Sequence, residues 1–375
     1  MGEVKLCRAC GVPANIGKTY AWRTGGVIVD RKATDRRMVI HDNEAFNKVF
    51  EDIEALIGLP VENMIIESRR RSNRIIQEEL FPAWQRRMLK ACLEIFMGPG
   101  LMGKTLGRPI EGIARRTTVK VNNIGRSVGL GDISLGELWG KGEKYPHREN
   151  IVRNPYSLPF YCGDALGATE GWEQLDMWVK YDEIGKNTFR VTTYEAKHPI
   201  ELQERLQARL YKFKEGDIRY EPCPLCEVPA SAARFVWNTG EGTITDPDTG
   251  RRAIMTDPIT LQVVLEDLET ELGEDISKAI IASQRASMKS AWSKAPLGPD
   301  SSTYRRMFAA QGLGNLKRFE MNDGGLRVLI ENSCLPLLMV GMMQAICEQL
   351  TQAGDSTYEW ELADDGDLEI SVVPA

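Results

Sequence analysis

Apolar residues recur every three or four positions in two stretches of the chain, between Asp42 and Gly58 and between Asp257 and Gly273. This spacing predicts an amphipathic helix in each stretch, with one face buried. The aspartate stands where a helix N-cap is expected, and the glycine follows the last apolar position, where helices commonly end. Pro258 suits the first turn of a helix and strengthens the second prediction.

The segments around these helices alternate apolar and polar residues, as antiparallel strands with one buried face do. Residues 20–40 alternate around two turn sequences, and residues 177–193 and 358–373 alternate near the end of each half of the chain. Further helices are predicted to begin near Glu62 and Glu274, where apolar residues again recur at helical spacing. Together these patterns predict an α+β fold in which helices pack on antiparallel sheets.

The whole pattern occurs twice along the chain, which predicts a tandem duplication with two pseudo-symmetric repeats. CRACGVPA at residues 7–14 returns as CPLCEVPA at residues 223–230. Later matches equate Trp22 with Trp237, Arg70 with Arg285, Gly163 with Gly341 and Glu170 with Glu348. The predicted domains are a first repeat at 1–198, with an insertion at about 93–128 that the other repeat lacks, a linker helix at 199–216 and a second repeat at 217–375.

The composition is that of a globular protein, with 42% apolar and 27% charged residues over 375 positions. A net charge of -6 argues against a general nucleic-acid-binding protein, whose binding surface is basic. The longest uncharged apolar run, residues 334–347, is too short to cross a bilayer and predicts a buried helix. The first residues lack the apolar segment of an export signal, so we expect a cytoplasmic protein with no membrane partner.

Two cysteine pairs, Cys7-x-x-Cys10 and Cys223-x-x-Cys226, have the form of zinc knuckles. A structural zinc ion needs four ligands, and each pair supplies two. We expect the pairs to meet about a pseudo-twofold axis and to form one structural zinc site, although iron is an alternative metal. Incomplete sites that a partner completes, a dithiol redox pair and packed free thiols are the competing interpretations. A redox pair normally opens a helix, whereas Val-Pro-Ala after each pair predicts an extended segment.

The predicted insertion is rich in glycine and basic residues. Its segment 98–105, GPGLMGKT, matches the phosphate-loop pattern. A phosphate loop follows a strand and opens a helix, and the sequence predicts neither element here. We therefore do not expect nucleotide hydrolysis. The insertion could bind an anionic group through Lys104, Arg115 and Arg116, and a glycine-rich cover without a ligand is the alternative.

The order of elements resembles the 4-vinyl reductase, or hydrocarbon-binding, domain. The resemblance is carried by Glu266-Asp-Leu-Glu-x-x-Leu-Gly273, Gly312-Leu-Gly314, the strand from Arg327 to Asn332, and Gly341 with Glu348. It implies an α+β fold that encloses an apolar pocket. Such domains sense small aromatic ligands in bacterial regulators, and a relative is tied to reduction of a vinyl group on a tetrapyrrole. Regulator members hold zinc through cysteines and a glutamate, but Glu331, Cys334 and Cys347 do not match that spacing closely.

These observations favour a binding protein for a small aromatic or otherwise apolar molecule, with a metal shared by the two repeats. We expect the ligand in the first repeat, near Tyr156, Phe160, Cys162, Glu170 and Trp172. A carboxylate such as Glu170 on a buried helix needs a partner or a ligand, unless its side chain faces solvent. The alternatives are an enzyme or enzyme subunit acting on an aromatic or tetrapyrrole compound, and a scaffold in a larger complex or homo-oligomer. No pair of residues has the spacing that would identify a catalytic group.

Overall fold

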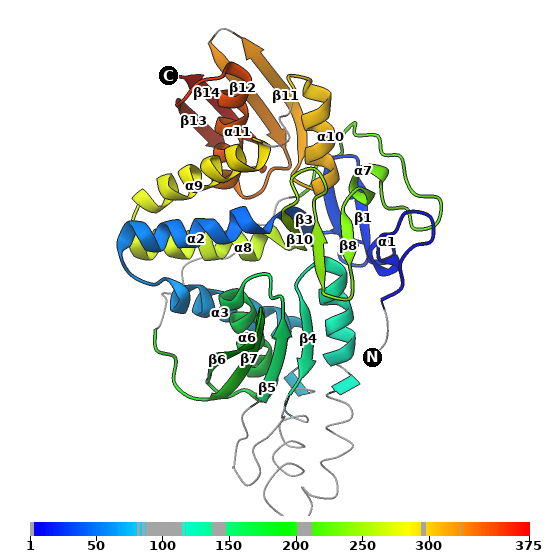
Figure 1. Ribbon diagram of the computed structural model, residues 1–375, viewed down its shortest axis with the longest axis vertical. Coiled ribbons are helices and arrows are strands. Elements are labelled where there is room, and N and C mark those ends of the chain that lie inside the picture. The colour runs from blue at the N-terminus through cyan, green and yellow to red at the C-terminus, as the bar shows by residue number, and fades with distance from the viewer. Residues whose placement is uncertain are drawn as a thin grey trace, which may run out of the picture.

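The computed structural model describes residues 4–375, with gaps at 81–82, 85–86, 88–114, 117, 137–147, 201–211, 294–297 and 323. The described chain is an α+β protein in which the strands form one sheet of six strands and two sheets of four, all with antiparallel neighbours (Figure 1). The predicted fold class is therefore confirmed at this level.

The elements follow the chain in two halves, joined by a connecting segment at 199–216. The first half, residues 4–198, contains α1 (Ala14–Thr19), β1 (Tyr20–Arg23), β2 (Val27–Asp30), β3 (Arg37–Asp42), α2 (Asn43–Ile57), α3 (Glu62–Leu80), β4 (Asp132–Leu135), β5 (Arg148–Arg153), α6 (Leu158–Glu173), β6 (Met177–Gly185) and β7 (Thr188–Glu195). The second half, residues 217–375, contains α7 (Ala230–Ala233), β8 (Val236–Asn238), β9 (Thr243–Thr245), β10 (Arg252–Thr256), α8 (Pro258–Leu272), α9 (Asp275–Trp292), α10 (Ser301–Gln311), β11 (Asn315–Asn322), β12 (Gly325–Glu331), α11 (Pro336–Thr351), β13 (Ser356–Leu362) and β14 (Leu368–Pro374).

The predicted helix boundaries are confirmed where capping residues define them. A carboxylate oxygen of Asp42 accepts a hydrogen bond from the backbone N–H of Ala45 at the start of α2, and Gly58 ends that helix with a φ of 71°. Asp257 caps α8 in the same way, through the backbone N–H of Ile259. Each cap satisfies a backbone donor that the first turn of the helix leaves unpaired, so the boundary follows from local sequence.

The six-stranded sheet joins the two halves. Its order is β1-β2-β3-β10-β9-β8, and β3 of the first half pairs with β10 of the second. In this pairing His41 lies opposite Ile254 and Asp42 lies opposite Ala253. Because the halves share an unbroken hydrogen-bonded sheet, neither half completes the sheet alone.

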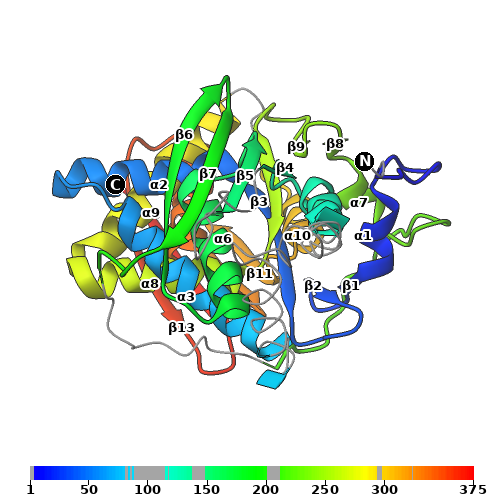
Figure 2. The ribbon, with the colours of Figure 1, turned by 90° about the horizontal axis from the view of Figure 1, so that it is seen from below.

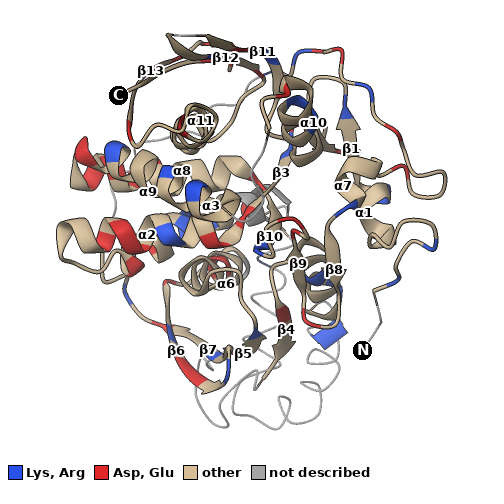
Figure 3. Cartoon of the chain, turned by 45° about the horizontal axis from the view of Figure 1, so that its top comes forward, with Lys and Arg blue, Asp and Glu red and all other residues tan. Residues whose placement is uncertain are grey.

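Each four-stranded sheet curves around one buried helix. The sheet β4-β5-β7-β6 holds α6, and the sheet β11-β12-β14-β13 holds α11, which is seen nearly end-on in Figure 3. The helix predicted from the uncharged run at 334–347 is α11, and nearly all of its side chains are buried. Between the two sheets, α2 packs against α9 and α3 packs against α8, so helices of opposite halves form the middle layer (Figure 1).

The β1–β2 hairpin of the first half and the β8–β9 hairpin of the second half each dock on the opposite half. The Trp22 indole N–H of the first half donates to the Ala310 carbonyl at 2.9 Å, and the Trp237 indole N–H of the second half donates to the Ser127 carbonyl at 2.9 Å. One arginine of each half also reaches across, Arg37 being buried and Arg252 half-buried. The Arg37 guanidinium donates to the Gly312 and Ser333 carbonyls, and the Arg252 guanidinium donates to the Gly129, Asn154 and Pro155 carbonyls.

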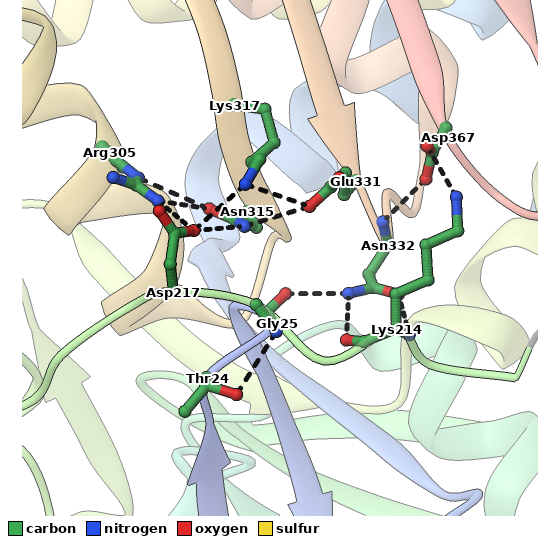
Figure 4. Close-up of polar contacts among 11 residues, drawn as sticks. Thr24, Gly25, Lys214, Asp217, Arg305, Asn315, Lys317, Glu331, Asn332 and Asp367 are labelled. Atoms are coloured by element: carbon green, nitrogen blue, oxygen red, sulfur yellow. Dashed lines mark hydrogen bonds and ion pairs between the residues drawn. The ribbon is translucent and has the colours of Figure 1, made fainter.

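The connecting segment runs through the same junction (Figure 4). The Asn332 side chain accepts from the backbone N–H of Lys214 at 2.7 Å and donates to the Gly25 carbonyl at 2.9 Å. Asp217 accepts from Arg305, at 2.5 Å, and from Asn315. The turn after β1, the connecting segment and the second half are thus joined by hydrogen bonds.

The predicted insertion and linker helix are only partly described. Residues 118–128, which fall inside the predicted insertion, are helical and lead into Gly129, whereas residues 212–216 of the predicted linker helix are not helical. Residues 201–211 of that helix, and residues 93–114 and 117 of the insertion, lie outside the described residues. None of the described helices is long and apolar enough to span a membrane.

Candidate metal centre and ligand cavity

The first cysteine pair lies in a tight hairpin that begins the first half. The backbone N–H of Cys7 donates to the Val12 carbonyl at 2.7 Å, and the backbone N–H of Gly11 donates to the Cys7 carbonyl at 2.9 Å. Gly11 has a φ of 76°, a conformation that glycine adopts without steric cost. This turn brings Cys7 and Cys10 to the same side of the hairpin.

The second cysteine pair has the same hydrogen bonds. The backbone N–H of Cys223 donates to the Val228 carbonyl at 2.9 Å, and that of Glu227 donates to the Cys223 carbonyl at 2.9 Å. Glu227 stands where the first hairpin has its glycine, and its φ is 63°. A non-glycine residue in this conformation is uncommon.

The two hairpins meet, and their four sulfur atoms form one cluster. The Sγ atoms of Cys7 and Cys223 are 3.8 Å apart, those of Cys10 and Cys226 are 3.4 Å apart, and all four lie within 4.8 Å of one another. A tetrahedral zinc site with Zn–S bonds of about 2.3 Å places its sulfur atoms about 3.8 Å apart, whereas a disulfide joins them at about 2.05 Å. The cluster therefore could hold a metal ion.

The hairpin backbone also favours thiolates, which are the form that binds metals. The backbone N–H groups of Ala9 and Cys10 lower the pKa of the Cys7 thiol. Those of Leu225 and Cys226 lower the pKa of the Cys223 thiol to about 6. Burial instead raises the pKa of Cys10 and Cys226, so these two thiols need the charge of a cation to ionise at neutral pH.

Packing holds the two hairpins against each other. Cys7, Cys223 and Cys226 belong to a hydrophobic cluster that covers one face of the six-stranded sheet. Gly17 of α1 lies directly against the second hairpin, because a Cβ atom there would come within 1.7 Å of the Cys226 carbonyl oxygen. Figure 2 shows α1 and α7, the helices that follow the hairpins, next to each other.

A cavity of about 70 Å³ lies at the junction of the two halves. Its wall is formed by α9, α10 and α11 of the second half together with β3 and the start of α2 of the first. Apolar lining residues include Met288, Trp292, Met307, Met339 and Met342. Polar lining residues include His41, Asp42, Arg251, Gln284 and Gln311.

Among the polar residues that line this cavity, His41 has a defined protonation state and tautomer. Burial lowers the pKa of its imidazole to about 4, so the ring is neutral near pH 7. Its Nδ1 lies 3.3 Å from the carbonyl oxygen of Asp42, which can only accept, and this contact requires the proton to be on Nδ1. Its Nε2 is then an acceptor, and it is buried without a hydrogen-bond partner among the described residues.

Arg251 is held in place at the cavity rim. Its guanidinium contacts Asp42 at 3.2 Å and Glu44 at 3.3 Å, and it donates to the Ser287 carbonyl and hydroxyl at 2.9 Å. These four contacts engage Nε and both terminal nitrogen atoms of the guanidinium. The Arg251 charge is therefore balanced by protein carboxylates.

The predicted ligand residues of the first half lie in packed core. Phe160 has no exposed surface and packs on Phe46, Phe50 and Tyr156. Cys162 is also fully buried, and burial raises the pKa of its thiol. Within the described residues, the lining of the cavity includes none of Tyr156, Phe160, Cys162 and Glu170. The side chain of Trp172 lies outside the described part of the chain.

Glu170 and Glu348 are buried and have charged partners. The Glu170 carboxylate contacts the Arg70 guanidinium at 2.5 Å and His198 Nε2 at 2.7 Å. The Glu348 carboxylate contacts Arg285 at 2.8 Å and Lys289 at 2.6 Å. The partner that a buried carboxylate requires is thus supplied by the protein.

Two further predicted sites are only partly described. Lys104 lies outside the described residues, whereas Arg115 and Arg116 are exposed, and Arg115 donates to the Leu135 carbonyl at 3.3 Å. At the second metal position considered above, Cys334 and Cys347 are free thiols outside any disulfide, Cys347 donates to the Val372 carbonyl at 3.9 Å, and Glu331 accepts from Asn315 at 3.1 Å.

His41 and the methionines of α9, α10 and α11 were missed from the sequence. The methionines have the spacing of ordinary core positions, and a lone histidine has no motif. Comparisons of the chain with known protein families, with characterised proteins and with solved structures found no match.

Proposed function

We propose that the chain is a cytoplasmic binding protein for a small aromatic or otherwise apolar molecule, whose two halves are fastened by a structural zinc ion. The cavity at the junction of the halves carries the proposal. It combines a mainly apolar wall with polar groups gathered in it, as small-molecule sites do.

The cavity is small but has an adaptable wall. An engineered cavity of about 150 Å³ lined by apolar side chains binds benzene, and this one is about half as large. Four methionines line it, and unbranched methionine side chains readily change rotamer to admit a ligand. Trp292 adds an aromatic surface for stacking. A ligand of one aromatic ring therefore fits the site after modest side-chain movement.

His41 limits the chemistry of the ligand. A buried acceptor without a partner costs about 1–3 kcal/mol, and His41 Nε2 is in this condition. A ligand with an O–H or N–H group removes that cost, whereas a wholly hydrocarbon ligand does not. The neutral ring provides no positive charge to hold an anion.

In the described part of the first half, polar side chains stand where the proposed duplication would place an equivalent cavity. The duplication equates Arg69 with Gln284, Asp164 with Met342 and Tyr156 with Cys334. In the first half, the Arg69 guanidinium contacts Asp164 at 2.6 Å, and the Tyr156 hydroxyl donates to Asp164 at 3.3 Å. These polar side chains fill the equivalent position of the first half, so the ligand is proposed for the cavity at the junction and not for the residues of the first half that the sequence suggested.

The paired contacts support the proposed duplication and the shared zinc. The two tryptophans, the two cross-half arginines and the two cysteine hairpins each make matching contacts with the opposite half. A pseudo-twofold axis between the hairpins would relate all three sets. Zinc is favoured over other metals because four thiolates at tetrahedral spacing are its usual structural site.

The proposal is tested by filling the cavity. Ala291 is buried and lines the cavity, so Ala291→Leu places three additional carbon atoms there. We expect toluene and phenol to bind the unmodified protein in calorimetry, phenol more tightly, and neither to bind Ala291→Leu at the same concentrations. The control variant is Leu56→Ala, on the exposed end of α2. Ala232→Leu would not serve, because Ala232 is packed in the core. Absence of binding to the unmodified, zinc-loaded protein would contradict the proposed function.

A further inference from the structure

The second cysteine hairpin leads directly into the wall of the cavity. After Cys226 the chain continues through Val228, which is fully buried, and the short helix α7 to Phe235. Phe235 belongs to the same hydrophobic cluster as the cysteines and also lines the cavity. Nine positions of chain therefore separate a metal ligand from a residue that a bound molecule would touch.

Phe235 is held in place from both sides. The Arg234 guanidinium lies 4.5 Å from the centre of its ring, and the same guanidinium contacts Asp246 at 2.7 Å. Asp246 also lines the cavity. On the side of the metal centre, Phe235 packs edge to face on Trp237, with ring centres 6.2 Å apart.

We propose that Phe235 is a positioning residue through which the four-cysteine centre sets the affinity of the cavity for its ligand. The proposal rests on the proposed function. With the metal bound, Cys223 and Cys226 are fixed against the first hairpin, and the segment 223–235 has one position. Without the metal, that segment gains conformational freedom, and ordering it again opposes ligand binding.

The coupling must act in both directions. If the metal raises ligand affinity by some factor, the ligand raises metal affinity by the same factor. A factor of about 5–10 corresponds to about 1–1.4 kcal/mol, which is within the usual range of coupling between two sites. A bound ligand should therefore raise the affinity of the centre for zinc without touching it. Because differences in affinity lie mostly in the dissociation rate, the ligand should also slow the loss of zinc.

The experiment uses the zinc-loaded full chain and measures zinc release to a chromophoric chelator, with and without saturating toluene. We expect toluene to slow the release about 5–10-fold. Phe235→Ala should still bind toluene in calorimetry, but toluene should no longer slow its zinc release. Ile28→Ala is the matched control: Ile28 lies in the same cluster, but outside the segment 223–235 and away from the cavity lining, so the effect of toluene should persist.

The outcomes separate the two proposals. If toluene binds but leaves the rate of zinc release unchanged, the link through Phe235 is wrong and the proposed function stands. If toluene slows release equally in Phe235→Ala, the effect is general stabilisation and the link is again wrong. If toluene does not bind the unmodified protein, both proposals fail.

Discussion

At the scale of single residues, His41 is a buried base that the folded state keeps neutral. Its pKa is about 4 in the folded protein, against about 6.5 for a free histidine. The charged groups that line the cavity with His41 are Asp42, Asp246, Arg251 and Arg252, and Asp42 contacts Arg251. Protonation is therefore easier in the unfolded chain than in the folded one.

The first prediction follows from this difference. As the pH falls from about 6.5 to about 4, the unfolded state binds a proton that the folded state excludes, so stability decreases by up to about 3 kcal/mol. Above pH 6.5 the His41 ring is neutral in both states, so it no longer makes the free energy of unfolding depend on pH. Urea unfolding of the unmodified protein and of His41→Leu should show that the variant loses less stability over that range. Parallel pH profiles of the two proteins would contradict the assigned burial of His41.

The second prediction concerns the buried carboxylate of Glu170. Arg70→Met leaves Glu170 without its closest cation, and breaking a buried ion pair from one side costs about 3–5 kcal/mol. Arg74 contacts the same carboxylate at 3.6 Å, but its side chain is 37% exposed, so Arg74→Met should cost about 0–1 kcal/mol. Urea unfolding measures both. Equal losses in the two variants would show that Glu170 does not depend on Arg70.

At the scale of elements, the helices were predictable and their docking was not. The caps of α2 and α8 are local, since Asp42 and Asp257 bond to backbone groups two or three positions away. The β1–β2 and β8–β9 hairpins dock through contacts with the backbone of segments far along the chain. Such contacts leave no periodic pattern in the sequence.

The third prediction tests the docking of the hairpin β1–β2. Gly26 has a φ of 75°, and a Cβ atom there would lie 2.3 Å from the Gly314 carbonyl oxygen. Gly26→Ala should therefore displace the hairpin from the second half. Its loss of unfolding free energy should be several times the loss that a strained φ alone causes. Gly58→Ala is the control, because Gly58 has a φ of 71° and nothing within 4 Å. Its cost should be about 1–2 kcal/mol. Thermal unfolding that ranks the two variants equally would contradict this docking.

The location of the cavity could have been inferred only from a comparison of the two halves. Under the proposed duplication, Gln284 and Met342 correspond to Arg69 and Asp164. The first pair lines the cavity, whereas the second pair forms an ion pair. Each position viewed alone is an ordinary helix residue, which explains why aromatic residues of the first half attracted the prediction instead.

At the scale of the whole molecule, the two halves are joined in a sheet, a helical layer and a sulfur cluster. The spacing of the cysteines predicts two ligands from each half, and the structure brings all four together. Binding of a metal to the folded state alone adds about 4 kcal/mol when the free metal is at a thousand times its dissociation constant. We expect a strong chelator to remove that amount, as measured by urea unfolding, while circular dichroism shows that the helices of the shared core persist.

The most direct test of the account is X-ray absorption at the zinc edge, combined with the metal content of the purified protein. The account predicts one zinc ion per chain and a single shell of four sulfur atoms at about 2.3 Å. It also predicts that Cys10→Ser in the first half and Cys226→Ser in the second each disrupt the same ion. A metal-free protein, two ions per chain, or a shell that contains nitrogen would contradict a centre built from both halves.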